Sequence, residues 1–135
     1  MFMKVIEVSE VVGVEPQTLS KLLKEFTMTV PEIEGAALVT DEGLPIVSVL
    51  PEGVDETKIA AMTAAILSLG EQTSKELGKG SLEQVYIKGK NGYIIAMDAG
   101  SNAVLAVIAS SEAKLGLVLF RMEQLAEKIS KIISL

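Results

Sequence analysis

The sequence predicts an α+β domain with three layers, α/β/α, around a central five-stranded antiparallel sheet, in the element order α-β-β-α-β-β-β-α. One observation is length, because 135 residues suffice for one domain with a single substantial core. Another is composition: 49% of the residues are hydrophobic but only 4% are aromatic, so aliphatic side chains must build that core. The third is that residues 36–39 and 103–109 are apolar at every position, which indicates strands covered on both faces.

The first half of the chain predicts a helix, a hairpin and a second helix. Pro16 suits the first turn of a helix in which Leu and Phe then recur at helical spacing. Residues 34–49 are two short apolar strands joined at Asp41-Glu-Gly43, where glycine accepts a positive φ. Asp55 is an expected N-cap, and the next helix runs over residues 55–77.

The second half predicts three strands and a final helix. Residues 82–88 mix polar side chains on both faces, as an edge strand does. Two further strands follow at 93–98 and 103–109, after turns that contain Gly and Asn. From Leu115 to Ile132 apolar residues recur at spacings of three and four, which predicts a long last helix.

The middle helix is apolar on all sides, with no charged residue between Ile59 and Gly70. One stripe, suited to packing on the sheet, consists of Ile59, Met62, Ile66 and Leu69. A stripe on roughly the opposite side, at about 100° per residue, consists of Ala60, Ala64 and Leu67. Because the other helices are needed elsewhere, the second stripe favours contact with another protein chain. The alternative is that alanine is simply a good helix former and that one exposed leucine has no meaning.

The predicted edge strand gives a second indication of a partner. An exposed edge invites pairing, and pairing with its own copy would remove the edge with two-fold symmetry. The alternative is that Glu83 and Lys88 protect the edge by their charge. The predicted partner or dimer interface consists of Ala60, Ala64, Leu67, Ser68, Glu71, Glu83, Val85 and Ile87.

Composition and charge argue against several classes of function. A formal charge of −6 with no Lys/Arg cluster on a predicted face argues against nucleic acid binding. The chain has no histidine and no cysteine, which argues against a Ser-His-Asp or Cys-His nucleophile and a histidine-based metal site. We expect no metal site, no catalytic residues and no bound cofactor. No uncharged stretch approaches the roughly 20 apolar residues that a membrane span needs, so we expect no membrane insertion. The lack of cysteine fits a reducing cytoplasm, where we place the protein.

Two features that could suggest chemistry have simpler explanations. Carboxylates around the hairpin could bind a hard cation, but caps, turns and solvated loops account for them. These carboxylates are Glu32, Glu34, Asp41, Glu42, Glu52, Asp55 and Glu56. The run Gly78-Lys-Gly-Ser81 resembles a fragment of a phosphate loop, yet it lacks the full spacing and follows a helix instead of opening one.

Most of the chain, from about Leu22 to Ile133, resembles the Roadblock domain of the Roadblock dynein light chains and their prokaryotic relatives. The matching segments are Glu34-Gly-Ala-Ala-Leu-Val39, Asp41-Glu-Gly-Leu-Pro-Ile-Val-Ser48, Ile59-Ala-Ala-Met-Thr-Ala-Ala-Ile66, Gly100-Ser-Asn-Ala-Val-Leu-Ala-Val-Ile108 and Leu115-Gly-Leu-Val118. Residues 1–15 fall outside the pattern and form an N-terminal extension to a single domain of residues 16–135.

The resemblance implies a profilin-like fold and a non-enzymatic function. Among the prokaryotic members of this family, the chain is similar to the gliding-motility partner of a Ras-like GTPase. This similarity implies a homodimer or heterodimer in which the middle helices lie side by side and the edge strands pair. The joint surface would bind a small GTPase or serve as a scaffold. Arg121, the only arginine, is expected on a solvated face or in an ion pair and not as a finger inserted into the GTPase. The alternative function is a small-ligand sensor, since helices flanking a sheet can enclose a pocket.

Overall fold

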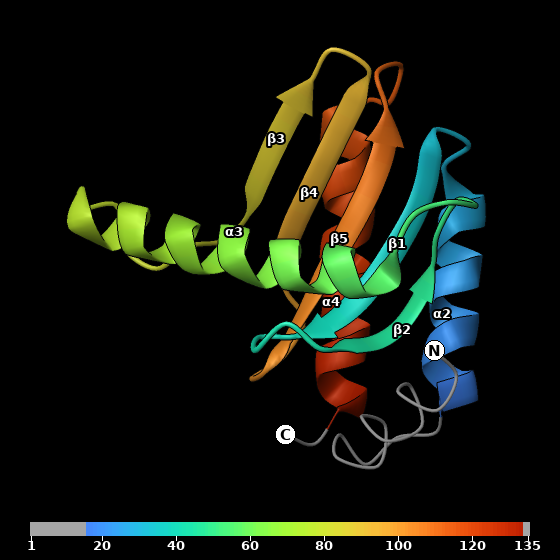
Figure 1. Cartoon of the computed structure of the whole chain (residues 1–135), viewed down its shortest axis with the longest axis horizontal. Coiled ribbons are helices and arrows are strands. Elements are labelled where there is room, and N and C mark those ends of the chain that lie inside the picture. Colours follow the sequence, from blue (N-terminus) through green and yellow to red (C-terminus); the bar gives the residue numbers. More distant parts are fainter. Residues whose placement is uncertain (1–15, 134–135) are drawn as a thin grey trace.

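The structure is a computed structural model in which residues 16–133 are described. It contains α2 (Pro16–Thr29), β1 (Ile33–Thr40), β2 (Pro45–Val49), α3 (Glu56–Glu76), β3 (Val85–Gly89), β4 (Gly92–Asp98), β5 (Ala103–Ser110) and α4 (Leu115–Ile132). The element order is the predicted one (Figure 1). The proposed extension, residues 1–15, lies outside the described residues.

The five strands form one antiparallel sheet in the order β2-β1-β5-β4-β3. The two strands predicted to be covered on both faces, β1 and β5, lie next to each other inside the sheet and pair along their whole lengths, for example Leu38 with Leu105. Nearly every residue of both strands is buried. The absence of apolar–polar alternation therefore identified the centre of the sheet correctly.

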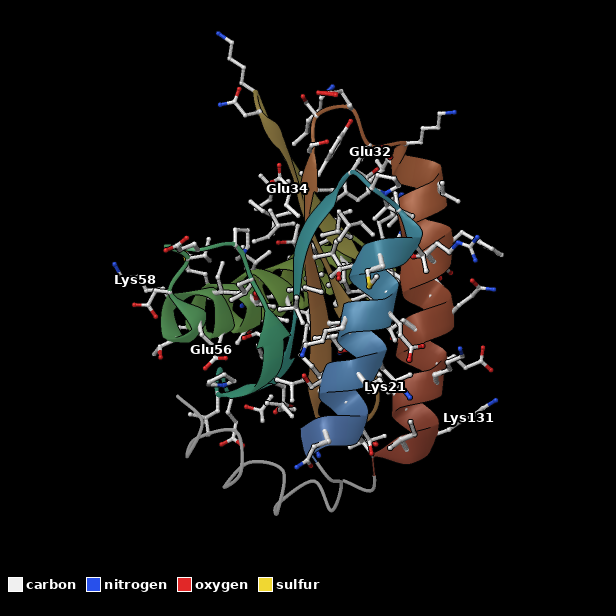
Figure 2. All side chains as sticks on the ribbon, turned by 90° about the vertical axis from the view of Figure 1, so that its right-hand side faces the viewer. Lys21, Glu32, Glu34, Glu56, Lys58 and Lys131 are labelled. Atoms are coloured by element: carbon white, nitrogen blue, oxygen red, sulfur yellow. The ribbon has the colours of Figure 1, made fainter. Side chains whose placement is uncertain are left out.

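The helices divide between the two faces of the sheet. In Figure 1, α3 crosses in front of the strands, whereas α2 and α4 lie behind them. Figure 2 shows α2 and α4 side by side on one face, with Lys21 and Lys131 on their outer surfaces. The larger core lies between these two helices and the sheet and includes Leu19, Leu23, Leu38, Leu105, Met122 and Ile129. A smaller core beneath α3 consists of Ala37, Val39, Ala60, Ala96 and Val104. The predicted three-layer fold is confirmed.

Short-range contacts fix the start of α3 and its position on the sheet. The Asp55 side chain accepts hydrogen bonds from the backbone N–H groups of Thr57 (2.9 Å) and Lys58 (3.3 Å), as expected of an N-cap. One residue later, the carboxylate of Glu56 is buried and accepts a hydrogen bond from the Ser48 hydroxyl on β2. The first turn of α3 is therefore tied to the edge of the sheet opposite β3.

The edge strand β3 is shorter at its start than the sequence predicts. Residues 82–84 are not in the strand, which begins at Val85. Leu82 instead packs against α3, and its backbone N–H donates to the Glu71 carboxylate at 3.1 Å. The mixture of polar and apolar residues over 82–88 predicts one continuous edge strand, but the backbone N–H of Leu82 is bound by the helix and not by β4.

Candidate protein interface

The two apolar stripes of α3 do not face the sides that the sequence predicts. The stripe that contains Ala60 was expected to face a partner, and the stripe that contains Leu69 was expected to face the sheet. Ala60 has no exposed surface and belongs to the core beneath α3, and Leu67 packs against the same core. Met62 and Leu69 are 52% and 64% exposed. The stripe with more alanine faces the chain's own sheet. In the other stripe Met62 and Leu69 face outward, whereas Ile59 packs against the core beneath α3.

Close packing explains why the small residues face inward. Gly43, at the β1–β2 turn with a φ of 95°, lies against α3. A Cβ added there would be 3.5 Å from the Ala61 Cα and 3.6 Å from the Ala64 Cβ. Only small side chains let the turn and the helix approach this closely. Both stripes are apolar at helical spacing, so periodicity alone could not decide which one meets the sheet.

The C-terminal half of α3 extends past the edge of the sheet beyond β3 (Figure 1). Gly70 holds this part of the helix close to the start of β3, because a Cβ at that position would lie 2.5 Å from the Val85 Cγ2. Glycine inside a helix costs about 1 kcal/mol relative to alanine, and the close approach to Val85 is its structural reason here. The sequence shows Gly70 in mid-helix, which is a signal that could have indicated this contact.

An open, mostly apolar groove lies between the projecting part of α3 and the edge strand. Its volume is about 500 Å³, and it is lined among others by Ile66, Leu69, Leu77, Leu82, Val85 and Ile87. On the adjoining sheet surface Ile87 and Ile94 are directly paired across β3 and β4 and are about 40% exposed. An exposed stripe, a groove and an open strand edge therefore form one continuous surface, which is called the α3–β3 surface below.

The predicted interface residues divide into two groups on this surface. Val85 and Ile87 line the groove, and Glu83 is exposed near the start of β3. Ser68 is also exposed, but it lines a different hollow on the other side of α3. Ala64 is half-buried under the turn, and Ala60 is fully buried, so Ala60 is not available to a partner. Glu71 already accepts the hydrogen bond from Leu82 and forms an ion pair with Lys75 at 3.2 Å. The outward residues Met62 and Leu69, which sequence reasoning assigned to the sheet, belong to the surface.

A second, polar hollow of about 360 Å³ lies on the other side of α3, between the helix and two turns of the sheet. It brings together the carboxyl groups of Asp41, Glu71 and Asp98. Burial, and then the charges of Glu71 and Asp41, raise the pKa of the Asp98 carboxyl above its ordinary value. This site is acidic and partly open, and Asp98 is a residue in it that the sequence analysis did not single out.

The raised pKa of Asp98 makes stability depend on pH. The stabilising effect of this group is complete below its unfolded pKa, near about 3.9, and is lost as the pH rises through the higher folded value. At pH 7 Asp98→Asn should therefore raise the Tm by roughly 2 °C, after allowance for solvent screening. The gain should vanish near pH 3. Thermal denaturation at both pH values, with Glu42→Gln as the exposed control, checks this; an equal gain at both pH values would contradict it.

The described residues carry little that suggests chemistry. Within residues 16–133, no group of three or more His, Cys, Asp or Glu side chains is placed to hold a metal ion. None of the helices in that range combines the length and apolar character that crossing a bilayer requires. Lys79 and Gly80 follow the C-terminal end of α3, so the phosphate-loop fragment has the wrong orientation to the helix. Arg121 is exposed on α4, where its Nη1 lies 3.5 Å from the Gln124 Oε1.

Comparison with known proteins decides the family. The sequence profile of the Roadblock/LC7 domain matches residues 19–109, which is more than half of the chain. The chain belongs to the Roadblock/LC7 domain family. Two uncharacterized proteins of Methanocaldococcus jannaschii are 37% and 36% identical to this Roadblock chain over 111 residues, which is 82% of the chain and 96% of each relative.

Solved structures confirm the Roadblock fold. A Roadblock/LC7 domain from Streptomyces avermitilis has a TM-score of 0.77 at 24% identity, covering 82% of this chain and 92% of that one. Myxococcus xanthus MglB has a TM-score of 0.79 at 24% identity, covering 87% and 89%. Profilin II of Acanthamoeba castellanii has a TM-score of 0.62 at 15% identity, covering 84% and 97%. The expected profilin-like architecture is therefore present, and at these identities the likeness concerns the fold alone.

Proposed function

We propose that this Roadblock protein is a non-enzymatic adaptor or regulator that forms a homodimer through its α3–β3 surface and binds a small Ras-like GTPase across the joint face. The single observation that carries the proposal is the outward apolar stripe of α3, which projects past an open strand edge over an apolar groove. Large contiguous apolar patches on soluble domains are typical of interaction sites.

A second copy is the partner that fits this surface best. Pairing β3 with β3 of another copy would satisfy the open edge and join two five-stranded sheets into one. The same two-fold axis would place the projecting half of each α3 over the other copy's sheet, next to the other α3. The exposed stripe and the groove would both be covered by one symmetric contact.

The class of the second partner rests on the family resemblance. The two α3 helices and the surrounding turns would form one face on one side of the joint sheet, where the switch loops of a GTPase could bind. Binding one arrangement of those loops more tightly than another would shift the nucleotide state without a donated catalytic group. Arg121 lies on α4, which covers the opposite face of the sheet, so it would not reach a partner bound on the α3 side.

The test is an affinity purification of the tagged full chain from a lysate of its source cells, in the presence of a GTP analogue or of GDP. Recovery of a small GTPase in one nucleotide state, identified by mass spectrometry, is the expected result. Recovery of the same proteins with both nucleotides would contradict a switch-reading function. A bound metabolite without any GTPase would overturn the proposal and favour the ligand sensor.

A further inference from the structure

The open edge of β3 carries a pattern of side chains that distinguishes between registers of self-pairing. We infer that two copies pair their β3 strands in one antiparallel register centred on Tyr86, so that Val85 of each copy lies opposite Ile87 of the other. This inference rests on the homodimer proposed above and adds how the two copies recognise each other.

The backbone limits which registers are available. A two-residue turn, Lys90–Asn91, closes the β3–β4 hairpin, with Gly89 paired to Gly92. The closing pair of such a hairpin exchanges hydrogen bonds, and hydrogen-bonded pairs alternate along an antiparallel ladder. Tyr86 and Lys88 therefore direct their backbone N–H and C=O groups away from β4, toward the open side of the edge.

The side chains follow the same alternation. Tyr86 is paired with Ile95 of the larger core and points to the α4 side of the sheet, whereas Val85 and Ile87 line the groove on the α3 side. A two-fold axis that pairs edge strands antiparallel is perpendicular to the sheet, so both α3 helices lie on one side. Opposed residues must then point to the same face, so the two-fold axis passes between two copies of one residue, which is the centre of the register. The side-chain-bearing residues of β3 that can be this centre are Val85, Tyr86, Ile87 and Lys88.

Cross-strand pairing selects among these four centres. A centre at Lys88 would oppose two lysines, and a centre at Val85 would place Glu83 opposite the apolar Ile87. A centre at Ile87 would leave Val85 opposite Gly89, which has no side chain to cover it.

A centre at Tyr86 avoids all three defects. On the groove face it forms two identical Val85–Ile87 pairs. On the other face it sets the two Tyr86 rings against each other and places Gln84 opposite Lys88.

The groove supports the same register. Val85 and Leu82 form its floor beside α3, with Ile66 and Leu69 on the helix above them. In the register centred on Tyr86, Ile87 of the second copy lies next to Val85 and enters this groove beneath the projecting helix. The apolar surface that one copy leaves open is then filled by an apolar side chain of the other, twice by symmetry.

Cysteine cross-linking tests the register directly, because the chain contains no cysteine. A disulfide requires Cα atoms about 4.4–6.8 Å apart. Residues at the centre of a hydrogen-bonded pair lie about 5.5 Å apart, whereas residues offset by two positions lie at about 8 Å. Mild oxidation should therefore cross-link Tyr86→Cys at least tenfold faster than Ile87→Cys or Lys88→Cys. A mixture of Val85→Cys and Ile87→Cys chains should cross-link as a heterodimer.

The solution mass of each variant, measured before oxidation, separates the two proposals. If the variants are dimers but Ile87→Cys cross-links fastest, the register is centred one residue further on, so the inference is overturned and the homodimer stands. If folded variants and the unsubstituted chain have the mass of a monomer, the homodimer and the inference both fail. Circular dichroism confirms folding, which substitution of the exposed Tyr86 should leave intact.

Discussion

Leu69→Glu should convert the proposed homodimer into folded monomers. Leu69 is 64% exposed on the outward stripe of α3 and lines the groove, so it contributes little to the core of a single chain. In the proposed dimer it would be covered, and a carboxylate there would be buried without a partner. An uncompensated buried charge costs several kcal/mol, so the dissociation constant should rise at least about 100-fold. Sedimentation velocity over a dilution series measures this change.

The matched control for Leu69→Glu is Met28→Glu, which adds the same charge at an exposed apolar residue of α2, on the other side of the sheet. It should leave the dimer unchanged. Equal weakening by both variants would show a general charge effect, and a Leu69→Glu chain that remains dimeric would show that the contact lies elsewhere. A loss of GTPase capture only with Leu69→Glu would tie the partner to the same face.

Ala60→Glu should unfold the protein or detach α3 from the sheet. Ala60 is fully buried against Ala37, Val39, Ala96 and Val104, where a larger side chain has no room and a charge has no partner. Overpacking alone typically costs 1–3 kcal/mol, and the buried charge adds several more. The total is comparable with the stability of about 5–15 kcal/mol that a whole domain has. Urea denaturation followed by circular dichroism checks the effect.

Ala65→Glu is the control on the same helix, because Ala65 is exposed. This variant should fold with nearly unchanged helix content, even where it weakens association. The two substitutions add the same side chain to the same residue type and differ in the face of α3 that carries it. An Ala60→Glu chain as stable as Ala65→Glu would reverse the assignment of the two faces.

The order of the elements could be predicted because local chemistry determines it. Asp55 caps α3, Gly43 adopts the expected positive φ, and the uniformly apolar β1 and β5 lie at the centre of the sheet. The predicted start of β3 is three residues early because residues 82–88 mix polar and apolar side chains as an edge strand does, whereas α3 binds the backbone N–H of Leu82. That contact is tertiary, and the residues of the segment itself do not indicate it.

The candidate site was predicted as a region but not residue by residue. The unbroken apolar run of α3 predicts apolar residues on both of its sides, and the structure has Ala60 buried against the sheet and Leu69 exposed on the outer side. Which side meets the sheet depends on the depth of the space beneath the helix, and the close approach of Gly43 to Ala61 and Ala64 sets that depth. A sequence shows the period of apolar residues but not the distance between two layers, so Ala60 and Leu69 were placed on the wrong faces.

Hydrogen–deuterium exchange of the full chain at high and low concentration tests the proposed α3–β3 contact most directly. Tyr86 and Lys88 direct their N–H groups to the open edge, so only a partner strand can protect them from exchange. We expect a peptide covering β3 to be protected at high concentration and to exchange rapidly on dilution, while a peptide from β5 exchanges equally slowly in both. Rapid exchange of β3 at a concentration where the protein is a dimer, with twice the 14.3 kDa mass of one chain, would contradict the proposed contact.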